Sequence, residues 1–181
     1  MKAVLISIQP KWCELIASGK KTVEVRKTKP KLETPFKCYI YETQGRTETP
    51  FVDEEGHHIF KGRGQVIGEF VCDEITPLFN VATTSWDLLA GNVHEYAKAL
   101  VRMARLTEEE MHSYAKGENC YAWHISDLVI YDKPRELSEF VRPCNHVNDC
   151  WTCDRWDYIG NRCYNEIRKP PQSWCYVESV D

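Results

Sequence analysis

The chain of 181 residues has no long run of apolar residues. No stretch approaches the ~18 apolar residues that a membrane-spanning helix needs. The apolar part of the amino-terminal MKAVLISIQPKW is too short, and too quickly interrupted, for a signal peptide. Internal repeats and low-complexity tracts are lacking as well, which argues against a repeat architecture. We therefore expect a cytoplasmic protein that does not contact a membrane.

The composition is that of an ordinary globular domain, with 43% hydrophobic and 28% charged residues, but the charge is unevenly distributed. Residues 1–37 hold nine Lys/Arg against three Glu, and residues 38–141 hold nine against eighteen acidic residues. An acidic body with one basic segment fits a phosphate-bearing ligand at one place better than non-specific wrapping of a duplex. A lysine-rich edge that discourages strand pairing explains the charge equally well.

The nine cysteines fall into two groups. Cys13, Cys38, Cys72 and Cys120 lie in segments that read as helix or strand, where a lone cysteine behaves as a small buried hydrophobic residue. The other five follow residue 141. In a reducing cytosol, such crowding indicates a metal site rather than disulfides.

Within this second group, the spacing C-x5-C-x2-C-x9-C predicts a structural zinc site. The predicted ligands are Cys144, Cys150, Cys153 and Cys163, with His146 as an alternative ligand. Four protein ligands would close the coordination sphere, which is typical of structural rather than catalytic zinc. Free thiols or a redox pair are the alternative.

The periodicity of apolar residues predicts an α+β fold. We expect strands over 3–8, 22–27, 36–42, 65–75, 120–132 and 172–178, and helices over 10–18, 92–105 and 107–115. These elements suggest a mixed, mostly antiparallel sheet that curls into a barrel and carries about three flanking helices. Residues 142–169 follow neither period, so we expect one domain of 1–141 plus 170–181 with a cysteine-rich, zinc-stapled insertion.

The stretch GKKTVEVR fits the pattern G-x-K-x-x-E-x-R, with Gly19, Lys21, Glu24 and Arg26 at the fixed positions. Strand alternation places Glu24 and Arg26 on the same face. A charged Lys21 and an Arg26 oriented by Glu24 would make a good clamp for an anion. A partly exposed ladder of ion pairs is the alternative, and it would contribute little to stability.

This motif, together with SIQPKWCELIASG, GQVIGEFVCDEI, YAWHISDLVIYDKPREL and PPQSWCYVE, resembles the ASCH domain of the PUA-like superfamily, which is common in bacterial and phage genomes. The resemblance covers residues 2–138 and 170–179. It implies a small β-barrel that binds RNA or nucleotides in a cleft lined by the motif. One branch of the family hydrolyses the acetyl amide of N4-acetylcytidine, and another member is described as a ribonuclease.

Carried over by residue, the resemblance gives Lys21 the place of the motif lysine, the nucleophile or activator of the hydrolytic branch. Glu24, the second catalytic candidate if the chain is a hydrolase, stands where the branch has a threonine, which argues against hydrolysis. Arg26 resembles a phosphate or base contact, and Lys20 and Trp12 complete the predicted ligand-binding set. The acid/base glutamate of that branch has three candidates here by position, namely Glu109, Glu110 and Glu118.

Trp12, Trp123 and Trp174 lie in the family-like segments and could stack on a base, although their apolar neighbours favour core positions. His124 is expected to be structural. We therefore expect a domain that binds RNA or a modified nucleoside or nucleotide. The alternatives are a nucleoside amidohydrolase or ribonuclease and, third, a protein-interaction module or phage-encoded modulator of a host.

Overall fold

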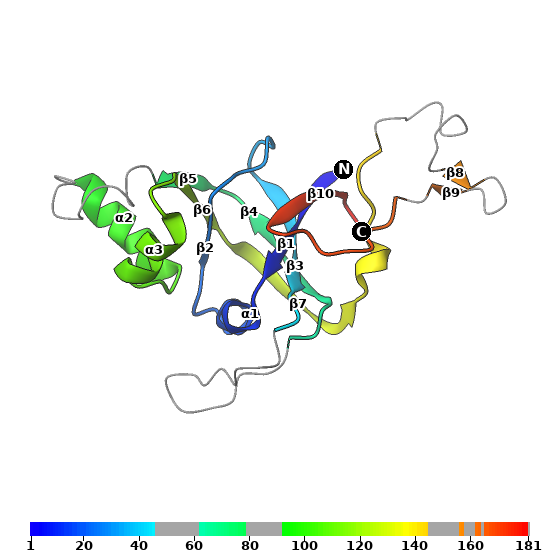
Figure 1. Ribbon diagram of the computed structural model, residues 1–181, viewed down its shortest axis with the longest axis horizontal. Coiled ribbons are helices and arrows are strands. Elements are labelled where there is room, and N and C mark those ends of the chain that lie inside the picture. Colours follow the sequence, from blue (N-terminus) through cyan, green and yellow to red (C-terminus); the bar gives the residue numbers. More distant parts are fainter. Residues whose placement is uncertain (46–61, 79–91, 145–155, 158–161, 164, 181) are drawn as a thin grey trace.

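The computed structural model describes residues 1–45, 62–78, 92–144, 156–157, 162–163 and 165–180 (Figure 1). The helices are α1 (Pro10–Ala17), α2 (Asn92–Met103) and α3 (Glu108–Ala115). The strands are β1 (Lys2–Ile8), β2 (Val23–Arg26), β3 (Phe36–Glu42), β4 (Val66–Cys72), β5 (Ile75–Leu78), β6 (Cys120–His124), β7 (Ser126–Arg135), β8 (Trp156–Asp157), β9 (Arg162–Cys163) and β10 (Trp174–Glu178).

These strands form a five-stranded sheet in the order β10-β1-β3-β4-β7, a three-stranded sheet in the order β2-β6-β5, and the small pair β8-β9. β1 pairs with β3 in parallel, and the other described pairs are antiparallel. The predicted mixed, mostly antiparallel α+β fold with three helices is therefore confirmed. The predicted barrel is not closed, because no described ladder joins the two larger sheets or the edge strands β10 and β7.

The barrel stays open because two of the predicted strands each break part of the way along, and their two parts belong to different sheets. The run 65–75 becomes β4 in the large sheet and the start of β5 in the small one, and the run 120–132 divides into β6 and β7. The two breaks lie together, since the amide of His124 donates to the carbonyl of Glu74 and Ser126 Oγ donates to Val71. Bends of this kind form the corners between crossed sheets.

Local signals fix the elements that border the site. Pro10 begins α1, and Gly19 follows this helix with φ of 70°, a value that favours glycine. Thr107 caps α3 in a capping box with Glu110, as predicted. The turn after α1 leads to Lys21 and the turn before α3 leads to Glu109, and both residues line the cavity described below.

The hydrophobic core has three clusters, and each packs a different pair of layers together. One fills the space between α1 and the two sheets around Trp123. The second packs α2 and α3 against the small sheet, and both helices lie at one end of the molecule (Figure 1). The third lies on the opposite side of the large sheet around Phe140. The four scattered cysteines are at most 1% exposed, which confirms their predicted burial. Within the described part of the chain, no helix has the length and apolar character needed to span a bilayer.

Candidate functional site

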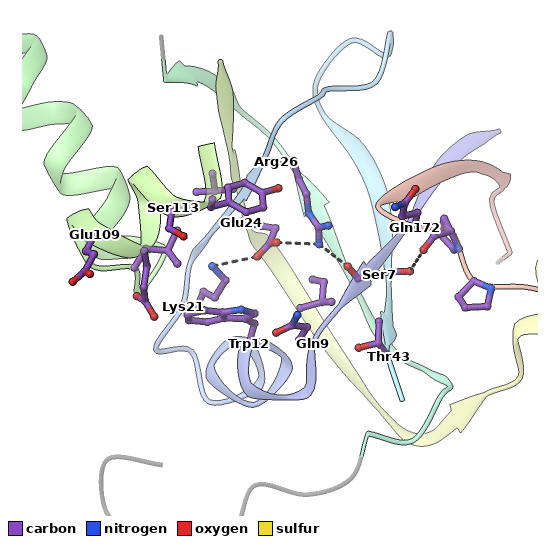
Figure 2. Close-up of a pocket in the computed structure, with 17 residues that line it drawn as sticks. Ser7, Gln9, Trp12, Lys21, Glu24, Arg26, Thr43, Glu109, Ser113 and Gln172 are labelled. Carbon is purple, nitrogen blue, oxygen red and sulfur yellow. Dashed lines mark hydrogen bonds and ion pairs between the residues drawn. The ribbon is translucent and has the colours of Figure 1, made fainter. Parts of the chain in front are cut away.

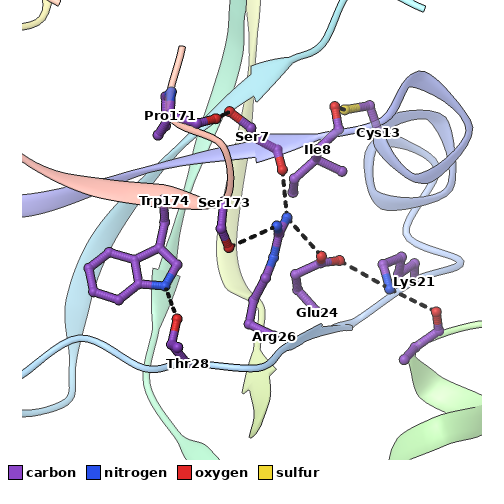
Figure 3. Close-up of polar contacts among 11 residues, drawn as sticks. Ser7, Ile8, Cys13, Lys21, Glu24, Arg26, Thr28, Pro171, Ser173 and Trp174 are labelled. Carbon is purple, nitrogen blue, oxygen red and sulfur yellow. Dashed lines mark hydrogen bonds and ion pairs between the residues drawn. The ribbon is translucent and has the colours of Figure 1, made fainter. Parts of the chain in front are cut away.

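The three charged residues of the motif form a continuous chain of ion pairs at the start of β2. Lys21 Nζ lies 3.2 Å from one carboxylate oxygen of Glu24, and Arg26 Nη2 lies 3.0 Å from the other (Figures 2 and 3). The residues are only 3%, 6% and 8% exposed, respectively. Glu24 and Arg26 thus share a face, as predicted, but the alternative of a partly exposed ladder is wrong because the pairs are buried.

The triad formed by Lys21, Glu24 and Arg26 also ties distant segments together. Lys21 Nζ donates to the carbonyl of Ala104, directly after α2, at 2.7 Å. Arg26 Nη2 donates to the carbonyl of Ser7 in β1 at 2.6 Å, and Arg26 Nη1 to Ser173 Oγ, next to β10, at 3.4 Å (Figure 3). Arg26 Nε is buried and has no hydrogen-bond partner among the described residues. The triad therefore links four segments at one side of a hollow.

That hollow is a cavity of about 850 Å³. Its walls come from the end of β1, α1, β2, α3 and residues 170–172 (Figure 2). Of the predicted ligand-binding set, Trp12, Lys21, Glu24 and Arg26 line it. Lys20 does not: it is exposed, and its carbonyl accepts a hydrogen bond from Arg105 Nε. The structure thus brings together four of the five predicted residues.

The three candidate glutamates occupy different surroundings. Glu109 and Glu110 line the cavity from α3. The carboxylate of Glu110 accepts from the amide of Thr107 at 2.8 Å in the capping box, whereas Glu109 has no such bond among the described residues. Glu118 lies outside the lining and pairs with Lys27 at 2.6 Å; the hydrogen bond from Lys27 lowers the pKa of Glu118. Glu109 is therefore the glutamate best placed to contact a ligand.

Among the three tryptophans, only Trp12 reaches the cavity. Its ring centroid lies 5.1 Å from Lys21 Nζ, and the ring is partly exposed. Trp123 is fully buried, which confirms its core position, and packs against Phe36 and Trp174. Trp12 is thus the one of these three tryptophans that a ligand in the cavity can touch.

His124 lies away from the cavity, as expected for a structural histidine. Its Nδ1 is 2.7 Å from Asp73 Oδ1. Burial alone would raise the pKa of Asp73, but the hydrogen bond and charge of His124, together with further hydrogen bonds from the backbone and Ser126, lower that pKa overall. The pair links the turn between β4 and β5 to the end of β6.

Several polar lining residues have no counterpart in the sequence predictions, among them Gln9, Ser113, Tyr114 and Gln172. Gln9 and Gln172 are exposed, and each adjoins a proline, Pro10 or Pro171. Burial raises the pKa of the Tyr114 hydroxyl. A glutamine beside a proline in a family-like segment is only a weak sequence signal for a cavity residue. The sequence pattern also does not show that Gln9 and Gln172, so far apart in the chain, line the same cavity.

The predicted zinc ligands are largely outside the described residues. Cys150, Cys153 and His146 are not described, and for Cys163 only the backbone in β9 is. Cys144 is a partly buried free thiol. No group of three or more potential metal ligands occurs in the part of the chain that is described. The zinc site and the boundaries of the insertion therefore stay predictions.

The fold thus combines mixed sheets joined at two corners with a buried charged triad on the wall of a cavity. The family model for the ASCH domain matches residues 6–132. Because this match spans most of the chain, the protein belongs to the ASCH domain family. No curated protein matches the chain.

Solved structures of one bacterial protein have a similar fold. The crystal structure of ASCH from Zymomonas mobilis is 23% identical with a TM-score of 0.49, and the match covers 96% of this chain and 86% of that chain. A serine-to-alanine mutant of that protein is 21% identical with a TM-score of 0.54, and the match covers 96% of this chain and 87% of that chain. A tyrosine-to-phenylalanine mutant is 22% identical with a TM-score of 0.50, and the match covers 97% of this chain and 90% of that chain. Similarity at this level concerns the fold.

Proposed function

We propose that the cavity binds a nucleobase, either within RNA or in a modified nucleotide or nucleoside. The observation that carries this proposal is the partly exposed ring of Trp12 beside Lys21 on the wall of a cavity of about 850 Å³. Ligand cavities commonly measure about 300–1,000 Å³. Aromatic rings that stack on bases are the recurring feature of single-strand and base readers. The family resemblance points to the same class of ligand.

The charges on the lining favour a base over a phosphate inside the cavity. The described lining carries two cations, Lys21 and Arg26, and three carboxylates, Glu24, Glu109 and Glu110. Moreover, both cations already donate to Glu24 and to backbone carbonyls. A phosphate would meet a net negative lining, whereas an uncharged base offers donors to the glutamates and acceptors to Lys21. Lys21 and Arg26, which were predicted to clamp an anion, are thus better suited to donate hydrogen bonds to the acceptor edge of a base.

Replacing Trp12 with alanine is expected to weaken nucleoside binding about fivefold to 150-fold, because base stacking contributes ~1 to 3 kcal/mol. Isothermal titration with the four ribonucleosides and N4-acetylcytidine measures the affinity. Trp12→Phe keeps a ring and should retain most of it. Tyr96→Ala, which removes an exposed ring of α2 outside the lining, is the matched control. Unchanged affinity in Trp12→Ala would remove stacking on this residue from the proposal.

A second candidate function is amide hydrolysis of an acetylated nucleoside. The observation that favours it is that Glu109 lines the same cavity as Lys21, which supplies a lysine and a downstream glutamate together. However, Lys21 Nζ lies between the Glu24 carboxylate and the Ala104 carbonyl, and both stabilise an ammonium ion. An ammonium ion is not a nucleophile. We therefore favour binding, and an experiment on Lys21 separates the two functions in the Discussion.

We also propose that Cys144, Cys150, Cys153 and Cys163 hold a structural zinc ion, with His146 as an alternative ligand. The spacing of these residues supports the proposal, because two thiolates of a C-x2-C turn can grip one ion while two flanking ligands complete a tetrahedron. Such a metal would stabilise a segment that lacks an apolar stripe of its own.

Elemental analysis of the purified protein is expected to return about one zinc per chain, and Cys150→Ser/Cys153→Ser should lose it. Cys120→Ala alters a buried cysteine outside the cluster and should keep the metal. Less than about half an equivalent in the unaltered protein would contradict the assignment.

A further inference from the structure

The structure has a second hollow, of about 530 Å³. Arg142, Glu166, Arg168 and Lys169 line it, and we refer to it as the basic groove. Lys169 in the groove is directly followed by Pro170, which lines the cavity. The linings of the groove and the cavity thus include two consecutive residues, whose Cα atoms are about 3.8 Å apart.

The backbone that carries the groove is held in place. Val141 and Glu166 form an antiparallel bridge, and the amide of Arg142 donates to the carbonyl of Asn165 at 2.9 Å. The amide of Ile167 donates to the carbonyl of Phe140 at 2.8 Å, and both of these side chains are buried in the third core cluster. The cations of the groove therefore project from an ordered, anchored segment.

The segment that follows the groove, residues 171–173, is anchored to β1 and to the buried triad. Ser7 Oγ donates to the carbonyl of Pro171 at 2.6 Å, and the amide of Ser7 donates to the carbonyl of Ser173 at 2.9 Å. Ser173 Oγ in turn accepts from Arg26 (Figure 3). These bonds hold residues 171–173, which follow the groove in the chain, against β1 and the triad.

The two hollows have opposite charge. The groove combines three cations with one carboxylate, whereas the described lining of the cavity combines two cations with three carboxylates. A phosphodiester is attracted to the groove, and an uncharged base is better accommodated in the cavity. The charge contrast therefore suits a nucleotide whose base and neighbouring phosphate are held in separate places.

We propose that the basic groove binds the phosphate next to the base in the cavity, so that the ligand is a nucleotide within a single strand of RNA. This inference rests on the proposed function of the cavity. It assigns a second contact to the groove cations Arg142, Arg168 and Lys169, outside the segment that the family model matches. It also gives a role to the three cations that lie around the bridge between Val141 and Glu166 in a chain of net negative charge.

The test compares two double variants of equal charge change. Arg142→Ala/Lys169→Ala removes groove cations, and Arg102→Ala/Lys133→Ala removes an exposed arginine of α2 and an exposed lysine of β7 that line neither hollow. The probes are fluorescently labelled short homopolymers of A, C, G and U, together with the matching nucleosides and nucleoside monophosphates. Fluorescence anisotropy and titration calorimetry over a range of salt concentrations measure binding.

The groove variant is expected to bind the preferred homopolymer about tenfold more weakly, with nucleoside affinity unchanged. The slope of log affinity against log salt should become shallower by about 0.7, the value for one lost phosphate contact on a single strand. Equal losses in both double variants would overturn the inference and leave the cavity proposal intact. A monophosphate that binds as tightly as the homopolymer would overturn the assignment to a strand. By contrast, absence of nucleoside binding in the unaltered protein would overturn the proposed function itself.

Discussion

Glu24→Gln is expected to lower the free energy of unfolding by about 3–5 kcal/mol, because removal of one partner leaves buried charges without compensation. The carboxylate of Glu24 lies between Lys21 Nζ and Arg26 Nη2, at 3.2 and 3.0 Å. The substitution changes neither length nor shape, so the loss reflects charge rather than packing. Urea unfolding measures it as a lower midpoint with an unchanged denaturant slope.

Glu33→Gln provides the matched control, since it makes the same chemical change at an exposed position. It should alter stability by less than about 0.5 kcal/mol. The double variant Lys21→Met/Glu24→Gln removes one of the stranded cations along with the carboxylate. It should therefore lose less than the two single variants combined, with a coupling energy of about 0.5–3 kcal/mol. A loss below about 1 kcal/mol for Glu24→Gln would show that water reaches the triad.

The triad illustrates what the sequence predicts well. Strand alternation was sufficient to place Glu24 and Arg26 on one face, and Gly19 with its positive φ was sufficient to end α1 before them. The capping box of α3 and the burial of the scattered cysteines were likewise predictable. Each of these features depends on residues within a few positions of one another, so the chemistry that decides it is visible in a short stretch.

Features that depend on distant partners were not predictable. A continuous apolar pattern over 120–132 does not reveal that Ile125 separates two strands in different sheets, because the choice of sheet depends on pairing partners. The burial of Lys21 requires α2 to end with the carbonyl of Ala104 beside it. Gln172 reaches the cavity only because residues 170–172 follow the path of β1. The motif can therefore be located from the sequence, but the walls of its cavity cannot.

The placement of Lys20 shows the same limit on a smaller scale. Two adjacent lysines carry the same charge in the sequence, yet Lys21 is 3% exposed and lines the cavity while Lys20 is exposed and does not. The turn after α1 sets this difference, since the amide of Lys21 donates back to the carbonyl of Leu15. The pair therefore offers an internal comparison between a buried and a surface lysine.

Lys21→Met is expected to weaken nucleoside binding about tenfold to 150-fold, whereas Lys20→Met should leave it unchanged. The ammonium of Lys21 is a charged donor on the cavity wall, and hydrogen bonds to charged groups contribute ~1.5–3 kcal/mol. Methionine keeps most of the side-chain length, and Glu24 remains paired with Arg26 at 3.0 Å. Circular dichroism on each variant verifies that the fold is retained before titration.

The same pair of variants separates binding from hydrolysis. With N4-acetylcytidine as the probe, we expect the unaltered protein to bind without releasing acetate, because Glu24 and the Ala104 carbonyl stabilise the ammonium form of Lys21. Acetate released by the unaltered protein and by Lys20→Met, but not by Lys21→Met, would instead establish the hydrolytic function. In that event Glu109→Gln should also abolish release, because Glu109 is the cavity glutamate that no described residue engages. Affinity and turnover, measured on the same lysine, therefore decide between a reader of bases and an enzyme that modifies them.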